Sequence, residues 1–137
     1  MAEEGTGIGA EPPVDVERRA ARFAVDGSFV AVAGDELIGR LDVEATSHGF
    51  GEIGMFVARD WRGRGVGSAL LESAIEFARE RGLHKLSLGV FTHNEAAIAL
   101  YRKYGFVDEG LRVKHLRRAN GELWDVLEMG LLLGEDT

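Results

Sequence analysis

The chain has 137 residues, of which 45% are hydrophobic and 28% are charged, and this is the composition of one globular domain with a core of its own. Its 23 acidic residues outnumber its 16 basic residues, so the net charge of −7 argues against a general nucleic-acid-binding protein. The sequence has no cysteine, which excludes disulfides, thiolate zinc sites and a cysteine nucleophile, and no apolar run approaches the roughly 18 residues of a membrane span.

The N-terminal half is expected to contain a tail, a helix and three strands. Residues 1–12 are rich in Gly and Glu and lead into a proline pair, which predicts a disordered tail. Residues 14–25 carry apolar side chains near helical spacing, which predicts a helix. Short apolar runs separated by glycine turns then predict three strands, over residues 29–32, 37–44 and 51–58.

The C-terminal half is expected to alternate helices and strands. From Val66 to Arg81 the apolar residues fall on one stripe, which predicts an amphipathic helix that ends at Gly82. Residues 83–91 are mostly apolar, as in a buried central strand. A second helix is predicted between Asn94, its cap, and Gly105. Two final strands, joined through an Asn-Gly turn, are expected over residues 106–113 and 123–133.

The run Arg62-Gly63-Arg64-Gly65-Val66-Gly67 lies between a predicted strand and a predicted helix, which is the arrangement of an anion site. Backbone N–H groups point outward there, glycines allow a phosphate to come close, and the arginines add charge. The run is not a P-loop, because no Lys follows its last glycine, and it lacks the glycine spacing and downstream acid of a dinucleotide loop. It therefore predicts a phosphorylated cofactor, with a glycine turn that binds nothing as the alternative.

A second motif runs from Asn94 to Phe106 and reads Asn-Glu-Ala-Ala-Ile-Ala-Leu-Tyr-Arg-Lys-Tyr-Gly-Phe. With the Arg-x-x-Gly-x-Gly loop, it resembles the GNAT acetyltransferase superfamily, whose motifs are Gln/Arg-x-x-Gly-x-Gly/Ala and Asn-x-x-Ala-x-x-Leu-Tyr-x-x-x-Gly-Phe. The two motifs have the order and approximate separation of the family, and the resemblance covers residues 28–133. The stretches after Gly105 and after Asn120 look most like members that acetylate small amines, amino acids or protein N-termini.

The resemblance implies an α/β GNAT fold, in which helices flank a mixed central sheet with two splayed parallel strands. One N-acetyltransferase domain is expected over residues 13–134, followed by a tail at 135–137. Family members usually begin with a strand and a helix before the segment at 14–25, and this chain is expected to lack that first strand-helix unit. The exposed sheet edge would then be covered by the tail or by a partner chain, as in a homodimer.

The resemblance also implies acetyl-CoA as the acyl donor. The residues expected to hold the CoA pyrophosphate are Arg62, Gly63, Arg64, Gly65, Val66, Gly67 and Ser68. Backbone groups of Met55, Phe56 and Val57 are expected to meet the pantetheine arm and to polarise the acetyl carbonyl, although strand packing alone would also explain their side chains. Asn94 resembles the family residue that contacts the pantetheine arm, and its alternative role is a helix cap. The four His lack metal-ligand spacing, so no metal is expected.

Tyr101 is the expected general acid, because the resemblance aligns it with the tyrosine that protonates the departing CoA thiolate. A core aromatic with an anchored hydroxyl is the alternative for Tyr101, and it is favoured for Tyr104 on nearly the same helical face. Glu52 matches the general base of some members, whereas the position that others use is Gly89 here. A solvated carboxylate at Glu52, or no base at all, is the alternative.

Five basic residues gather between the last two strands: Arg112, Lys114, His115, Arg117 and Arg118. They indicate a solvated hairpin or recognition of an acceptor carboxylate, while Asp125 and Glu109 would instead bind a cationic acceptor.

The expected function is direct acetyl transfer to a small primary amine, such as an amino acid or a polyamine. The alternatives are a protein N-terminal or lysine acetyltransferase and a noncatalytic acyl-CoA-binding module. The acidic N-terminus lacks an apolar signal core, which predicts a cytoplasmic protein without nucleic-acid or membrane partners.

Overall fold

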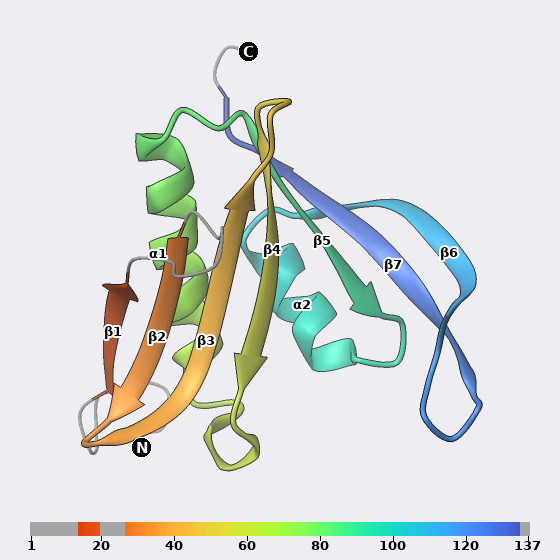
Figure 1. Cartoon of the computed structure of the whole chain (residues 1–137), viewed down its shortest axis with the longest axis horizontal. Helices are drawn as coiled ribbons and strands as arrows, with labels where there is room; N and C mark the ends of the chain where they lie inside the picture. Colours follow the sequence, from red (N-terminus) through yellow and green to blue (C-terminus); the bar gives the residue numbers. More distant parts are fainter. Residues whose placement is uncertain (1–13, 20–26, 135–137) are drawn as a thin grey trace.

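A computed structural model of the chain describes residues 14–19 and 27–134. They form a seven-stranded sheet, in the order β1-β2-β3-β4-β5-β7-β6, with two α-helices (Figure 1). The strands are β1 (Val14–Arg19), β2 (Gly27–Ala33), β3 (Glu36–Ala45), β4 (Phe50–Val57), β5 (Lys85–Phe91), β6 (Val107–Arg117) and β7 (Leu123–Leu132). The helices are α1 (Val66–Glu80) and α2 (Glu95–Lys103), and a single 3-10 turn spans Arg59–Trp61.

The sheet is mixed because one pair of neighbouring strands, β4 and β5, is parallel and every other pair is antiparallel. Three residue pairs join β4 to β5: Phe50–Lys85, Gly51–Leu86 and Glu52–Ser87. Beyond these pairs the two strands diverge toward the end of β4 (Figure 1), and we call the part of the sheet where they no longer pair the β4–β5 gap. This is the mixed sheet with splayed parallel strands that the family resemblance implies.

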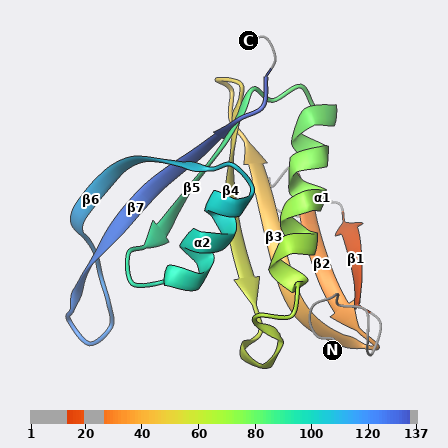
Figure 2. The same cartoon turned by 180° about the vertical axis from the view of Figure 1, so that it is seen from behind.

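Both helices lie on the same side of the sheet (Figure 2). The stripe of α1 that the sequence predicts is buried, and Leu70 and Leu71 are fully inaccessible to solvent. Each buried leucine of this kind stabilises the fold by about 1.5–3 kcal/mol. Side chains alternate along β4: Ile53 is buried toward the helices, whereas Glu52 and Phe56 are exposed on the opposite side. We call this opposite side the outer face of the sheet.

Strand β1 overturns one prediction. Residues 14–19 form a strand that pairs antiparallel with β2, from Val14 opposite Ala33 to Arg19 opposite Ser28, and not the start of a helix. Pairing with the edge of β2 therefore overrides the helical spacing of this short segment. The same strand corrects the expectation that a first strand is lacking, because β1 covers the β2 edge. The rest of the predicted helix, at 20–25, and the predicted tails at 1–12 and 135–137 lie outside the described residues.

The remaining predicted elements are confirmed. Gly82 ends α1 with φ +75°, in the left-handed conformation that glycine adopts without strain. Strand β6 runs four residues beyond its predicted end at Val113, because the Asn-Gly turn that joins it to β7 is tight and Arg118 N–H donates to the carbonyl of Glu122 at 2.7 Å. A bulge at Lys114, with φ +51°, lets the longer strand keep its pairing with β7.

Candidate functional site

The first turn of α1 has the features of an anion site. Its N-cap is Gly65, in the left-handed conformation with φ +87°, and no side chain caps the helix. No acidic residue lies in the first turn, so nothing within it repels an anion. The N–H groups that start a helix have no partner within it, so an uncapped N-terminus of this kind can accept an anion.

The two arginines of the loop are held by different contacts. The Nε of Arg62 donates a hydrogen bond to the carbonyl of Val57 at 3.1 Å, which ties the loop to the end of β4. The guanidinium carbon of Arg64 lies 4.2 Å from the centroid of the Trp61 ring, in a cation–π contact. The Arg62 contact qualifies the predicted role in phosphate binding, since part of that side chain positions the loop itself. The stacked Trp61 was missed at the sequence level, where it stood as an isolated aromatic residue.

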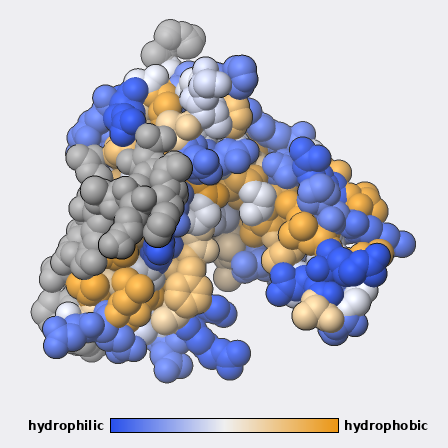
Figure 3. Space-filling model, viewed as in Figure 1, coloured by the Kyte–Doolittle hydropathy of each residue, from blue (hydrophilic) through white to orange (hydrophobic). Residues whose placement is uncertain are grey.

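The second half of β4 has a strand partner on one side only. It pairs with β3, where Met55 lies opposite Leu41, and among the described strands none pairs with it across the β4–β5 gap. Backbone donors and acceptors removed from water need partners. The backbone groups of residues 55–57 that bond neither to β3 nor to Arg62 therefore face the gap. In the space-filling view, the molecule is notched between the lower end of β4 and the β6–β7 hairpin (Figure 3).

The two tyrosines of α2 differ in their surroundings. Tyr101 is 6% exposed and packs against Phe106, and its hydroxyl makes no hydrogen bond to any residue that the structure describes. Burial raises the pKa of Tyr101 to about 12, so the hydroxyl keeps its proton at neutral pH. The hydroxyl of Tyr104 instead donates to a carboxylate oxygen of Glu72 on α1 at 2.6 Å. A buried tyrosine hydroxyl usually has a partner, and of the two tyrosines of α2 only Tyr101 has none among the described residues.

Asn94 caps α2. Its side-chain oxygen accepts a hydrogen bond from the N–H of Ala97 at 3.3 Å. This is the cap that the sequence predicts. The amide NH₂ of the same side chain takes no part in that bond, so capping is compatible with a ligand contact.

Glu52 lies on the outer face at the narrow end of the β4–β5 gap, where β4 is still paired with β5 through Ser87. Directly opposite Glu52, across the β3–β4 ladder, lies Glu44. Both residues are exposed. The structure thus brings a second carboxylate to the predicted base, and this pairing could not be predicted from the sequence because it depends on strand register.

Gly89, at the base position of other members, has a carboxylate beside it. Glu128 of β7 pairs with Gly89, and one of its oxygens lies 3.5 Å from the position that a Cβ of residue 89 would occupy. That carboxylate accepts from Arg112 Nε at 2.9 Å. Arg112 is thereby engaged within the hairpin, as the solvated-hairpin interpretation of the basic residues requires.

The two acids considered for a cationic acceptor are also engaged. Glu109 accepts from Lys85 Nζ at 2.9 Å, and Asp125 accepts from the backbone N–H of Lys114 at 2.7 Å. These contacts favour structural roles for both.

An aromatic cluster closes the end of β5. The Trp124 ring centroid lies 4.6 Å from that of Phe91 and 4.3 Å from that of His93. Arg118 covers Trp124, with its guanidinium carbon 4.4 Å from the ring centroid. The cluster joins the β6–β7 hairpin to β5, and sequence reasoning missed it because the strand register is needed to bring these residues together.

Two classes of feature are missing from the described part of the chain. No group of three or more His, Cys, Asp or Glu residues described by the structure could hold a metal ion. Neither described helix has both the length and the apolar character needed to cross a bilayer.

Comparison with known proteins gives consistent results. The model of the Acetyltransferase (GNAT) family matches residues 3–106. The chain is 34% identical over 119 residues to the L-amino acid N-acetyltransferase AaaT of Escherichia coli, covering 82% of this chain and 72% of that protein. It is 44% identical over 55 residues to the uncharacterized N-acetyltransferase MJ1207 of Methanocaldococcus jannaschii, covering 40% of this chain but only 24% of that protein.

A similar structure is that of an IAA acetyltransferase from Bacillus cereus. It has a TM-score of 0.76 and 25% identity, over 88% of this chain and 100% of that one.

Proposed function

Since the chain belongs to the GNAT acetyltransferase family, we propose that it is an N-acetyltransferase that transfers an acetyl group from acetyl-CoA to a primary amine. The observation that carries the proposal is the uncapped N-terminus of α1, which Arg62 ties to the end of β4 at the wide end of the β4–β5 gap. The substrate class of AaaT supports an amino acid as the acceptor. A polyamine or a similar small amine is the other candidate.

The described residues fit a CoA thioester. The first turn of α1, with Arg62 through Ser68, would hold the pyrophosphate on backbone N–H groups and arginine charge. Backbone groups of residues 55–57, which have no strand partner across the gap, would pair with the pantetheine arm and polarise the acetyl carbonyl. The unpartnered hydroxyl of Tyr101 would be the proton donor beside the sulfur.

The chemistry needs two proton transfers. When bound, acetyl-CoA supplies an activated acetyl group. The acceptor nitrogen forms a bond to the acetyl carbon, the carbon–sulfur bond breaks, and Tyr101 gives its proton to the departing sulfur. Glu52 would take a proton from the acceptor amine through water, from the narrow end of the gap. Direct attack without an acyl-enzyme is the route that the family resemblance implies, and the absence of cysteine is consistent with it.

The experiment that tests the proposal is release of CoA thiol from acetyl-CoA across a panel of amino acids, polyamines and peptides. Release that depends on one acceptor class supports the enzyme and names its acceptor. Release with peptides alone would favour the protein N-terminal or lysine alternative. Tight acetyl-CoA binding without release would favour the noncatalytic acyl-CoA-binding module.

Three further expectations stay predictions from the sequence: a single domain over residues 13–134, a homodimer and a cytoplasmic location.

Replacing Glu52 with Gln is expected to lower kcat/KM for the acceptor at least about tenfold at neutral pH, because the amide cannot accept the proton. The measurement is the steady-state rate of thiol release with saturating acetyl-CoA. Glu44→Gln is the matched control, since Glu44 lies opposite Glu52 on the same face. It should change kcat/KM less than about twofold, within the scatter of a surface charge change. Equal losses in both variants would show that negative charge, and not a base, is what the acceptor needs.

Asn94 offers a test that separates capping from ligand binding. Asp caps a helix as well as Asn, so Asn94→Asp should leave the free energy of unfolding nearly unchanged, whereas Asn94→Ala should lose about 1 kcal/mol. If the amide NH₂ also donates to the pantetheine arm, both variants raise KM for acetyl-CoA. An unchanged KM in Asn94→Asp would leave the residue as a cap alone. Chemical denaturation and initial rates measure the two quantities.

A further inference from the structure

Gly54 is a strand glycine without a structural reason to be glycine. Its φ is not in the positive range, and a Cβ added to it would meet no atom within 4 Å. It pairs in register with Asp42, with no bulge in the β3–β4 ladder. Glycine inside a strand weakens it, because the unfolded chain gains freedom and no side chain packs.

The other glycines of the described strands have explanations. An added Cβ would come within 3.0 Å of a neighbouring side chain at Gly27, Gly39, Gly51, Gly89 and Gly130. Gly110 has open space around it but lies at a register shift of β6, where bulges commonly carry glycine. Gly54 alone among these strand glycines has neither a close neighbour nor a bulge.

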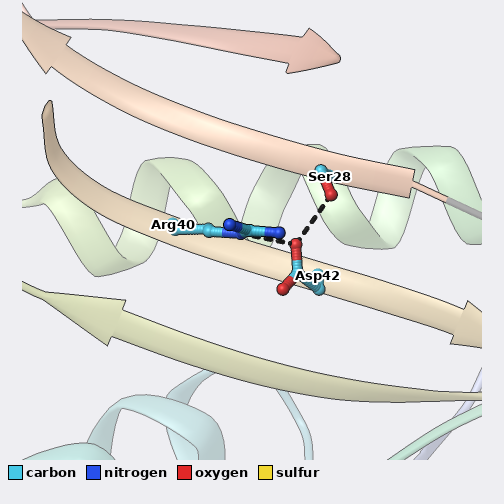
Figure 4. A network of polar contacts seen from close by, with 3 residues as sticks. All are labelled: Ser28, Arg40 and Asp42. Atoms are coloured by element: carbon cyan, nitrogen blue, oxygen red, sulfur yellow. Dashed lines mark hydrogen bonds and ion pairs between the residues drawn. The ribbon is translucent and has the colours of Figure 1, made fainter. Parts of the chain in front are cut away.

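The surroundings of Gly54 keep the space beside it clear. Along β4 it lies between Glu52 and Phe56 on the outer face, and the Phe56 side chain is 57% exposed. Its cross-strand neighbour, Asp42, is held by two hydrogen bonds to one carboxylate oxygen, from Ser28 Oγ at 2.7 Å and Arg40 Nε at 2.9 Å. That oxygen points toward β2, away from β4 (Figure 4). The Asp42 carboxylate, directly opposite Gly54, is thereby tied to Ser28 of β2, and the space that a Cβ of residue 54 would occupy stays free.

The position of Gly54 in β4 suggests what the open space beside it is for. The last residue pair between β4 and β5 is Glu52–Ser87, so Gly54 is two residues into the part of β4 that borders the gap. Under the proposed function, the acetyl carbon lies in that gap and the acceptor reaches it from the outer face, past Gly54. A methyl group there would stand in the path of the acceptor.

We propose that Gly54 keeps open the passage by which the acceptor reaches the acetyl group, and that the acceptor is an α-amine, as in an amino acid or a peptide N-terminus. The inference rests on the proposed function and narrows its acceptor from primary amines in general to α-amines. In an unbranched amine the carbon bonded to the nitrogen is a methylene with one further carbon substituent. In an α-amine that carbon is branched and carries two further substituents. An α-amine therefore needs a wider passage, which a side chain at residue 54 would narrow.

The test compares the parent protein with Gly54→Ala and Gly110→Ala, the latter a matched control in open space on β6. The α-amine probes are L-methionine and a peptide that begins with alanine, and the unbranched probe is putrescine. We expect Gly54→Ala to lower kcat/KM for the α-amine that the parent uses at least about tenfold, the effect of a misplaced methyl group in a substrate site. For putrescine the loss should be below about threefold. The KM for acetyl-CoA should stay at the parent value, and the unfolding midpoint should not fall, because alanine at an unhindered strand position is at least as stable as glycine. Gly110→Ala should match the parent in every kinetic parameter.

Several results would overturn the inference. Parent-like kcat/KM in Gly54→Ala, or an equal loss in Gly110→Ala, would remove the role of the glycine. A parent that acetylates putrescine but neither α-amine would refute the substrate class. A lower unfolding midpoint in Gly54→Ala would mean that packing explains the glycine. A parent that releases no thiol with any acceptor would overturn the proposed function itself, and this inference with it.

Discussion

Replacing Tyr101 with Phe is expected to lower kcat at least about tenfold while leaving acetyl-CoA affinity nearly unchanged. The phenyl ring would fill the same space against Phe106, so only the unpartnered hydroxyl is lost. Because that hydroxyl bonds to no described residue, its removal should not reduce the free energy of unfolding. The measurements are kcat from thiol release and the dissociation constant from calorimetry.

Tyr104→Phe is the matched control, because Tyr104 is three residues away on the same helix and its hydroxyl is committed to Glu72. It should keep kcat within about twofold and lose on the order of 1 kcal/mol of stability with that hydrogen bond. Unchanged turnover in Tyr101→Phe, or equal losses in the two variants, would contradict the assignment of Tyr101 as the acid.

The pKa of Tyr101 adds a stability signature. Since burial raises it to about 12 from the ordinary value of 10.0, the folded state holds the proton more tightly than the unfolded state. The resulting contribution to stability is fully present below pH 10 and is lost as the pH rises toward 12. Tyr101→Phe should therefore show a smaller loss of stability across that window than the parent, as measured by denaturant midpoints.

Replacing Gly65 with Ala is expected to weaken acetyl-CoA binding at least about tenfold, which corresponds to about 1.4 kcal/mol. Gly65 is the N-cap of α1 with φ +87°, a conformation that costs alanine about 1–2 kcal/mol. Relief of this strain would turn the first N–H groups of α1 away from a common point. The pyrophosphate would then lose the set of donors that holds it. The dissociation constant of acetyl-CoA measures the effect.

Gly34→Ala controls for the strain itself. Gly34, in the turn between β2 and β3, also has a positive φ, of +62°, and open space around it. It should lose a similar free energy of unfolding but keep the parent affinity for acetyl-CoA. If both variants bind acetyl-CoA equally well, the loop around Gly65 is a turn that holds no phosphate.

The elements that the sequence predicted well are those specified by neighbouring residues. The apolar stripe of α1, its stop at Gly82 and the Asn94 cap of α2 are all visible within a few residues of sequence. Residues 14–19 were misassigned because their structure depends on the edge of β2, which local spacing does not reveal. A segment of six residues is also too short for periodicity to separate a helix from a strand.

The candidate site was predictable in its backbone and less so in its side chains. The glycine loop and Tyr101 were both identified from motif spacing, but the hydrogen bond of Tyr104 to Glu72 depends on the packing of α2 against α1. The carboxylate of Glu128 beside Gly89 needed the register between β5 and β7. Sequence spacing within one element carries no information on such contacts between elements.

Because few residue pairs join β4 to β5, the free energy of unfolding is expected to depend on the concentration of a ligand bound between them. Only three residue pairs connect the two strands, so part of the sheet is completed by whatever occupies the gap. A ligand that binds only the folded chain adds about 2.7 kcal/mol of stability at a concentration one hundred times its dissociation constant. Preparations that carry different amounts of copurified CoA would therefore melt at different temperatures, although the polypeptide is the same.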